Sequence, residues 1–336
     1  GRAMGEAVEL ALQAGGTWVD ALTDASLAKI GYDLKPLATG LLRVGRELAG
    51  PYDDLHVAAH LLDLPSARPD DFTARVLGGP PPDDRKALQA CADLLLGRTL
   101  LRRLKSAGGE RIYAEVENPL LPILAAMEAE GVGLDPKALR DMGRRLGDQL
   151  ERLERTIMDT AGVEFNVRST QQLAEVLFDR LQLAPGRKTK TGRSTSVEVL
   201  ENLALEHALP GQVLEYRQLA KLKSTYLDVL PRLADPEDGR LRTTFHQVGA
   251  ATGRLSSSDP NLQNIPIRTD MGRELRRAFV PAKHGRCLLS ADYSQIELRL
   301  LAHLSGDERM ISDFAEERDI HRATAAAIFK VPPDKV

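Results

Sequence analysis

The pattern of hydrophobic positions between residues 115 and 232 predicts a series of amphipathic helices. In ENPLLPILAAMEAEGV the apolar positions Leu120, Ile123, Leu124 and Met127 recur at helical intervals, and Gly131 and Gly133 close that helix. Asp135-Pro136 then supplies an N-cap and a first-turn proline for a long helix. Its predicted buried stripe comprises Leu139, Met142, Leu146, Leu150, Leu153 and Ile157.

Further helices follow in the same region. Ser169 and Thr170 are placed to start a helix over QQLAEVLFDRL, and PGQVLEYRQLAKLKSTYLDVL predicts another that ends near Pro231. We expect the apolar positions of all these stripes to form core.

The regions on either side have a different pattern. Residues 1–110 predict mixed α/β structure in which helices dominate, with a junction near GERIY. From residue 240 the period changes, because RLRTTFHQVG alternates and is rich in β-formers, which predicts a strand. CLLSADY predicts a second strand, followed at once by the helix SQIELRLLAHLSG and later by the helix DIHRATAAAIF. Strands interleaved with helices suggest an α/β layer in this last region.

Composition narrows the class of protein only slightly. The 336 residues contain 43% hydrophobic and 28% charged residues, which is ordinary for a globular protein. No run approaches the roughly 20 apolar residues that a membrane span needs. Two cysteines far apart, Cys91 and Cys287, form neither a metal-ligand pair nor a disulfide framework and fit a reducing compartment. The net charge of −3 does not indicate a nucleic-acid binder, although binding depends on where positive charge lies.

Two segments carry candidate chemistry. Asp292 follows an apolar run, where a buried strand is expected to end and to hold a carboxylate rigidly. Hard cations such as Mg²⁺ take oxygen ligands, so Asp292 is a candidate metal ligand, but an Asp in this position is also a common turn former or helix cap. The loop APGRKTKTGRSTS, with Arg187, Lys188, Lys190 and Arg193, is either a solvated loop or a phosphate-gripping tip.

The segment SADYSQIELRLLAHLSGD resembles the first palm motif of bacterial DNA polymerase I, a family A DNA polymerase. The resemblance implies that Asp292 binds magnesium as a catalytic residue and that the backbone carbonyl of Tyr293 also contacts metal. It further implies that Glu297 packs under the sugar of the incoming nucleotide, with Gln295 beside it.

The segment ATGRLSSSDPNLQNIPIR resembles the primer-template segment of the same family at nearly every position. The resemblance implies that Arg254 reaches the minor groove at the primer terminus and that Arg268 contacts a phosphate. Minor-groove acceptors are nearly the same for every base pair, so the amides of a polar loop can test pair shape without reading sequence. The amides expected in this role belong to Asn261, Gln263 and Asn264.

Resemblance also extends along the helical region. EYRQLAKLKSTYLDVLP looks like the long thumb helix that grips the duplex, with Arg217, Lys221 and Lys223 near one face. RKTKTGRSTSVEVLE resembles the thumb tip. In ERDIHRATAAAIF the resemblance places His321 near the triphosphate of the incoming nucleotide, whereas a histidine opening a helix is more often a cap or a surface residue.

A weaker similarity links the start of the chain to the second proofreading-exonuclease region of the family. Asp33 and Asp93 would then be metal ligands and Asp54 a neighbouring structural acid, but Gln89 stands where a tyrosine is expected. The first Asp-x-Glu pair of such a nuclease is absent from the chain, and a two-metal nuclease needs several carboxylates together. We therefore expect no exonuclease activity from these residues.

The resemblance implies an α+β, mostly α, fold with three regions. They are the C-terminal part of an RNase H-like, inactive exonuclease-type domain (1–112), a helical thumb (113–238) and a partial palm with an antiparallel sheet (239–336). The resemblance also implies a fragment of a DNA-directed DNA polymerase that uses Mg²⁺, primer-template duplex and deoxynucleoside triphosphates. Because the fingers helix and the second catalytic aspartate are not present, we expect no polymerisation by this chain alone. The alternatives are a non-catalytic nucleic-acid-binding module and a 3′–5′ exonuclease remnant. A monomer in the bacterial cytoplasm, associated with the nucleoid and with no membrane partner, is expected.

Overall fold

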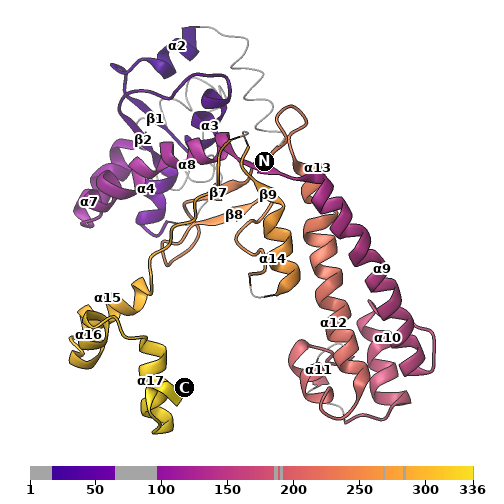
Figure 1. The fold of residues 1–336 in the computed structure, drawn as a ribbon. Coiled ribbons are helices and arrows are strands. Elements are labelled where there is room, and N and C mark those ends of the chain that lie inside the picture. Colours follow the sequence, from indigo (N-terminus) through magenta and orange to yellow (C-terminus); the bar gives the residue numbers. More distant parts are fainter. Residues whose placement is uncertain are drawn as a thin grey trace. The chain divides into compact units, whose positions relative to one another are not determined.

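The computed structural model describes residues 17–64, 97–184, 188–189, 192–267, 269–282 and 285–335. It is mostly helical with small sheets, as the sequence predicts (Figure 1). The chain divides into two compact units, Gly1–Arg286 and Cys287–Val336. Within the described ranges, no helix is both long enough and apolar enough to cross a bilayer.

The first unit begins with a small α/β arrangement. Two short strands pair in parallel, with Lys29 opposite Tyr52 and Gly31 opposite Asp54, and the helix between them provides the crossover connection. A further helical stretch covers residues 97–106. The elements are α2 (Thr17–Thr23), β1 (Lys29–Gly31), α3 (Lys35–Arg43), β2 (Tyr52–Asp54) and α4 (Leu55–Leu61).

A continuous helical run crosses the junction that the sequence predicts near GERIY. It consists of α7 (Glu110–Ile112), the π-helical turn η1 (Tyr113–Glu117) and α8 (Asn118–Glu130). Tyr113 packs in the same hydrophobic cluster as Leu55, and its hydroxyl donates to Asp53 Oδ1 at 3.1 Å. The start of the predicted thumb therefore packs against the N-terminal α/β part, and a domain boundary at residue 112 stays a prediction.

The buried face of α8 differs in part from the predicted one. Ile123 and Met127 were expected in the core, but they are 56% and 47% exposed and line an apolar groove with Leu241. Leu124 is buried as predicted, and Leu120 is half-buried. The other buried residues are Leu121, Ala125 and Glu128. Both faces of this helix are rich in apolar residues, and the face with the carboxylate is the one that packs because polar partners satisfy Glu128 there.

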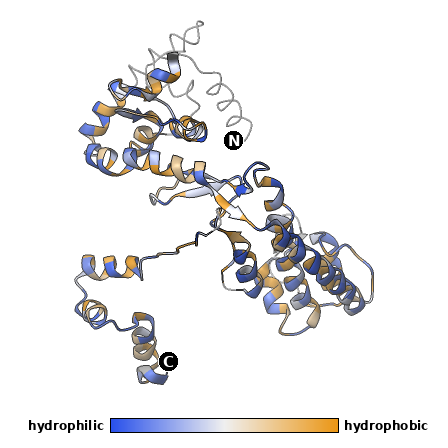
Figure 2. Cartoon of the chain, turned by 45° about the horizontal axis from the view of Figure 1, so that its top comes forward, coloured by the Kyte–Doolittle hydropathy of each residue, from blue (hydrophilic) through white to orange (hydrophobic). Residues whose placement is uncertain are grey.

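The central helical part confirms the predicted pattern. Asp135 caps α9 (Pro136–Ala161) by accepting from the amides of Lys137 and Ala138, both at 2.9 Å. The predicted stripe is buried in the main hydrophobic cluster, where Leu153 packs at its edge. Ser169 caps the next helix as expected. Figure 2 shows hydrophobic and hydrophilic residues interspersed along these helices. They are α10 (Thr170–Glu175), η2 (Val176–Arg180), α11 (Val197–Leu203), α12 (Ala208–Leu222), η3 (Lys223–Leu227) and α13 (Leu230–Leu233).

A three-stranded antiparallel sheet pairs the strand that precedes α9 with two strands that follow α13. Strand β3 lies in the centre, with Gly133 opposite Arg240 on one side and Val280 on the other. A side chain at Gly133 would lie 2.7 Å from the carbonyl oxygen of Val280, so the close approach of the strands requires glycine. The elements are β3 (Val132–Leu134), β6 (Arg240–Leu241), β9 (Phe279–Val280) and α14 (Asp270–Arg277).

Two antiparallel pairs complete the first unit. In one, β7 (Thr244–His246) pairs with β8 (Ser256–Ser258). In the other, β4 (Lys188–Thr189) pairs with β5 (Gly192–Arg193). The predicted strand at 240–249 is therefore divided between β6 and β7.

Among its described residues the second unit has three α-helices and one short 3-10 helix, and the predicted strand CLLSADY is wrong. Residues 287–293 form no strand, and Leu288 and Leu289 are 57% and 91% exposed. A strand forms only when its backbone hydrogen bonds to a neighbour, and no segment of the described chain pairs with these residues. The predicted helices are confirmed as α15 (Ile296–Ser305) and α17 (Ile320–Phe329). Between them lies α16 (Glu308–Ala315), and η4 (Pro333–Lys335) follows.

Leu146 provides a test of the core of the first unit. Its side chain is fully buried on α9, so Leu146→Ala should lower the free energy of unfolding by about 2–5 kcal/mol through lost burial and a residual cavity. The matched control is Leu205→Ala, since Leu205 is 87% exposed and its truncation should change stability by less than about 0.5 kcal/mol. Urea denaturation followed by circular dichroism measures both, and equal losses would contradict this core.

Candidate functional site

The polar segment 252–267 is braced by its own side chains and by its neighbours. Ser257, only 4% exposed, accepts from the amide of Leu262 at 3.2 Å and lies 3.4 Å from Gln263 Oε1. Thr243 Oγ1 lies 3.0 Å from the carbonyl oxygen of Ser258 and 2.7 Å from that of Pro260. The pairing of β7 with β8 fixes the start of the segment, so its shape is set by many short-range hydrogen bonds.

The predicted base-contacting residues lie on this segment, and some of their side chains already form hydrogen bonds within the chain. Asn261 Oδ1 accepts from the amides of Gln263 and Asn264, and Gln263 Nε2 donates to the carbonyl of Leu255 at 3.0 Å. In the described chain the Asn264 side chain makes no hydrogen bond, and it is exposed, as is Arg254. The side-chain amides of Asn261 and Gln263 therefore stabilise the loop, whereas that of Asn264 faces outwards. Arg268 lies outside the described residues.

The three predicted cations of the helical part have separate surroundings. Arg217 donates to Thr195, with Nη1 at 2.5 Å from its carbonyl oxygen and Nη2 at 3.2 Å from Oγ1, and burial lowers the pKa of Arg217. Lys223 forms an ion pair with Asp228 at 2.7 Å. Lys221 is exposed, and its ammonium makes no ion pair within the described ranges. Of the three, Lys221 is the cation available to a phosphate.

This cationic helix is tied directly to the polar segment. The hydroxyl of Tyr226, in the π-helical turn that begins at Lys223, donates to the backbone carbonyl of Asn264 at 2.6 Å. Ile265 is buried in the main hydrophobic cluster with Tyr226. The end of α12 and the segment that carries Asn264 therefore form one continuous surface of the first unit.

The thumb-tip loop is described only in part. Arg187 and Lys190 lie outside the described residues, and only the backbone of Lys188 is described. Arg193 forms a bidentate ion pair with Asp179 and its guanidinium lies 5.2 Å from the ring centroid of Phe178. Arg193 thus holds β5 to η2, and its charge is already neutralised.

In the second unit, Asp292 and Tyr293 lie in an extended segment before α15. Both are exposed, and Tyr293 is 80% exposed. The Asp292 carboxylate makes no hydrogen bond or ion pair with the part of the chain that the structure describes. An unneutralised carboxylate next to a backbone carbonyl provides oxygen ligands of the kind that Mg²⁺ binds. The described residues hold no cluster of three or more His, Cys, Asp or Glu side chains that could bind a metal ion. The role of Asp292 as a metal ligand stays a prediction.

The remaining predicted nucleotide-contacting residues lie at two helix starts of the same unit. Gln295 precedes α15 with a left-handed backbone (φ 51°), a conformation that costs a residue other than glycine about 1–2 kcal/mol. Glu297 lies in the first turn of α15. His321 opens α17, where its amide donates to the capping carboxylate of Asp319 at 2.9 Å while its imidazole is exposed.

Of the N-terminal acids singled out in the sequence, Asp33 is exposed and Asp54 is buried. Asp54 is buried and accepts from the amides of Asp33, Leu34 and His56 at 2.7–3.1 Å. Burial raises the pKa of Asp54, and these contacts give it the structural role that the sequence predicts. Asp93 and Gln89 lie outside the described residues.

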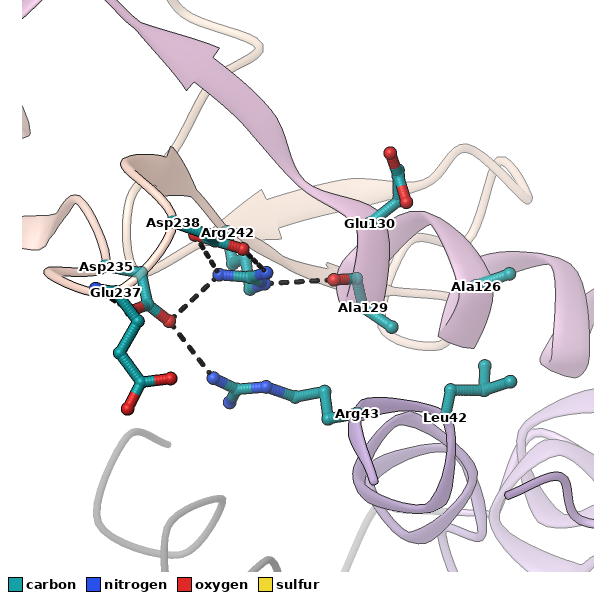
Figure 3. A pocket seen from close by; sticks show the side chains of 9 residues that line it. All are labelled: Leu42, Arg43, Ala126, Ala129, Glu130, Asp235, Glu237, Asp238 and Arg242. Carbon is teal, nitrogen blue, oxygen red and sulfur yellow. Dashed lines mark hydrogen bonds and ion pairs between the residues drawn. The ribbon is translucent and has the colours of Figure 1, made fainter. Parts of the chain in front are cut away.

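A pocket of about 450 Å³ lies between α3, the end of α8 and the turn before β6. Figure 3 shows Arg242 at its centre. Its Nε donates to the carbonyl of Ala129 at 3.0 Å, and its Nη atoms bind Asp235 and Asp238. Arg43 of α3 reaches Asp235 Oδ2 at 3.3 Å. The ion pairs of Arg43 and Arg242 in this pocket attach α3 and the end of α8 to the turn before β6.

The sequence analysis missed a second polar network, which is buried. Glu128 of α8 is 7% exposed, and its Oε1 binds Lys35 and accepts from the amide of Phe245 at 2.7 Å. Its Oε2 accepts from Thr39 at 3.0 Å. One signal was present, because Glu128 follows Leu121 and Leu124 at spacings of seven and four on one helix face.

Comparison with known proteins identifies relatives across most of the chain. The family model of DNA polymerase family A matches residues 136–336. The thermostable DNA polymerase I of Thermus thermophilus is 50% identical over 307 residues, 90% of this chain and 36% of that protein. The DNA polymerase I of Geobacillus stearothermophilus is 42% identical over 338 residues, 94% of this chain and 38% of that protein. The chain thus spans a little over a third of the length of these relatives.

A solved structure has the same fold. The polymerase domain of Pol1 from M. smegmatis, in complex with DNA primer-template and dNTP, matches with a TM-score of 0.86 and 35% identity. The match covers 95% of this chain and 57% of that chain.

The ion cluster of Figure 3 generates a pH-dependence prediction. Hydrogen bonds from Arg242 hold the pKa of Asp238 below its ordinary value of 3.8. A carboxyl whose folded pKa is lowered contributes stability above its unfolded pKa and loses it as the pH falls through the folded pKa. Asp238→Asn should therefore make the free energy of unfolding less dependent on pH below about 4.

The measurement is urea denaturation at several pH values between about 3 and 6. Glu237→Gln is the matched control, because Glu237 lines the same pocket but its carboxylate makes no ion pair in the described chain. This control should follow the unaltered chain. Identical acid dependence of Asp238→Asn and the unaltered chain would show that the Arg242 contact does not contribute.

Proposed function

This chain belongs to DNA polymerase family A, and from that membership we propose that it is part of a DNA-directed DNA polymerase. The reaction is attack of a primer 3′-hydroxyl on the α-phosphate of a deoxynucleoside triphosphate, with pyrophosphate leaving. In this proposal the first unit holds the primer-template duplex, and the start of the second unit contributes to the nucleotide and metal site.

The observation that carries the proposal is the braced polar segment 252–267. Its backbone is fixed by Ser257 and Thr243, while Asn264 and Arg254 are exposed. A rigid surface of amide and guanidinium groups suits the minor groove, whose acceptors are nearly the same for all base pairs. Such contacts would hold a correctly shaped duplex of any sequence, as template-directed synthesis requires.

We assign the duplex contacts according to the surroundings of each residue. Lys221 is the phosphate contact of α12, since Arg217 and Lys223 already have partners in the chain and would contribute only by exchanging them. Asn261 and Gln263 set the shape of the segment, and Asn264 and Arg254 face the bases. Arg268 is proposed as a further phosphate contact.

Asp292 would supply the carboxylate ligand of Mg²⁺, with the backbone carbonyl of Tyr293. The exposed, unpaired carboxylate fits a hard cation that needs only one or two carboxylates. When bound, the metal stabilises the charge that develops on the transferring phosphate. Glu297 and Gln295 would lie against the sugar of the incoming nucleotide, and His321 would donate a hydrogen bond to its triphosphate.

The partners are primer-template DNA and deoxynucleoside triphosphates, the process is DNA replication and repair, and the protein acts as a monomer in the bacterial cytoplasm near the nucleoid. The relatives supporting the bacterial assignment are the DNA polymerases I of Thermus thermophilus and Geobacillus stearothermophilus.

Lys221 tests the assignment of the duplex-binding surface. Removal of one phosphate contact reduces the dependence of log Kd on log salt concentration by about 1, so Lys221→Ala should lower the salt slope by that amount. The measurement is fluorescence anisotropy of a labelled primer-template hairpin at several salt concentrations. Lys105→Ala, an exposed lysine of the N-terminal part, is the control and should leave the slope unchanged. Absence of duplex binding by the unaltered chain would remove the proposal.

Asp292 tests the metal assignment in the protein that contains this chain. A metal ligand that contributes several kcal/mol of transition-state stabilisation corresponds to a rate effect of at least about a hundredfold. Asp292→Asn should therefore reduce kcat for primer extension by at least that factor, with duplex affinity nearly unchanged. Asp334→Asn alters another exposed carboxylate of the same unit and should retain full activity. Full activity of Asp292→Asn would contradict the assignment.

A further inference from the structure

A buried carboxylate connects three parts of the first unit that are distant in sequence. Glu128 is 7% exposed and Lys35 is 8% exposed, and the two form an ion pair inside the protein. Thr39 donates to the second oxygen of Glu128 at 3.0 Å. Burying a carboxylate is costly unless it is paired and hydrogen bonded, so these contacts determine where Glu128 can lie.

The third partner of Glu128 is a backbone amide of the strand next to the polar segment. The Phe245 amide donates to Glu128 Oε1 at 2.7 Å, and Phe245 is the central residue of β7. It pairs with Ser257 of β8, whose hydroxyl braces the segment by accepting from the Leu262 amide. The hydrogen bond to Phe245 and the pairing of Phe245 with Ser257 therefore connect the buried ion pair to the loop that carries Asn261 and Asn264.

A second contact holds the other end of the same strand. Gln247 Nε2 donates to the backbone carbonyl and to Oε2 of Glu117, at 2.5 and 2.7 Å. Val248 packs against the N-terminal hydrophobic cluster that includes Tyr113. The N-terminal part and the helical run 110–130 thus fix β7 at two separate points.

We propose that Glu128, with its charge balanced by Lys35, is a positioning residue for duplex binding. It sets the place of the β7–β8 hairpin, and through the hairpin it orients the polar segment 252–267. This inference rests on the proposed function. It assigns to the N-terminal part, which forms no metal cluster among its described residues, the role of a support for the duplex-binding surface.

The test separates the hydrogen bond to Phe245 from the charge of the ion pair. Glu128→Gln combined with Lys35→Met removes both charges but keeps an oxygen that accepts from the Phe245 amide. Glu128→Leu combined with Lys35→Met removes both charges and the acceptor. The two double variants are matched in the lysine change and in side-chain size, and they differ in the polar group offered to Phe245 and Thr39. In both variants the Thr39 hydroxyl keeps the carbonyl oxygen of Lys35 as an acceptor at 3.0 Å, whereas the Phe245 amide loses its acceptor only in the Leu variant.

We expect the Gln variant to bind a labelled primer-template hairpin within about twofold of the unaltered chain. The Leu variant should bind about tenfold more weakly, the scale expected when a buried donor loses its partner. Kd is measured by fluorescence anisotropy on the chain of residues 1–336, well below the melting temperatures of both variants. Equal affinity of the two variants would overturn the inference.

A double-mutant cycle separates positioning from a loss of stability. When Arg254→Ala is added, the Leu variant should lose little further affinity relative to the Gln variant, because both changes act through the same segment. When Lys221→Ala is added instead, the two effects should add, since Lys221 lies on α12. Additivity in both cycles would indicate a general destabilisation and would overturn the positioning role.

Hydrogen exchange measured without DNA tests whether Glu128 fixes the β7–β8 hairpin, independently of whether the chain binds duplex. The amides of β7 and β8 should exchange about tenfold faster in the Leu variant than in the Gln variant, while amides of α9 exchange alike. Equal exchange in β7 and β8 would overturn the inference even if the unaltered chain binds duplex. If the unaltered chain binds no duplex, the proposed function fails, and the role of Glu128 in duplex binding fails with it. Hydrogen exchange then still decides whether Glu128 fixes the hairpin.

Discussion

The arrangement of the first unit depends on the need to satisfy one carboxylate in its interior. Glu128 has three partners. Lys35 and Thr39 lie on α3, and Phe245 lies on β7, so no single segment supplies them all. A buried carboxylate without such partners would be strongly destabilising, so the packing that brings α3, α8 and β7 together is specified by polar chemistry as much as by apolar area. At the end of α8, Arg242 likewise draws its partners from separate segments. It donates to the carbonyl of Ala129 on α8 and to the carboxylate of Asp235.

Local patterns predicted those parts of the fold that have local causes. The stripe of α9 and its Asp135 cap follow from helical spacing and capping chemistry, and both are confirmed. Helix α16 was not predicted, although Asp307 is placed to cap it and does accept from the amide of Met310 at 2.8 Å. Of the residues predicted to be buried on α8, Leu124 is buried, but Ile123 and Met127 are exposed because periodicity alone cannot choose between two apolar faces. That choice depends on Lys35 and Phe245, which are distant in sequence.

The same distinction applies to the candidate site. The residue types and order of the polar segment are visible in the sequence, but the division between bracing amides and exposed amides is visible only in the structure. Arg217 and Lys223 look like equivalent surface cations in the sequence, and the structure shows that each has a partner. The strand predicted before Asp292 could not be judged from its own residues, because a strand requires a neighbour to pair with.

The uninterrupted helical run from Glu110 to Glu130 has a practical consequence for shortening the protein. Its first turns pack into the N-terminal cluster, and its last turn holds Glu128. A truncation that begins at residue 113 would retain Glu128 but remove Lys35 and Thr39, and the carboxylate would face a newly opened surface. A minimal version that omits the N-terminal part would therefore require redesign of this helix face as well as a new starting point.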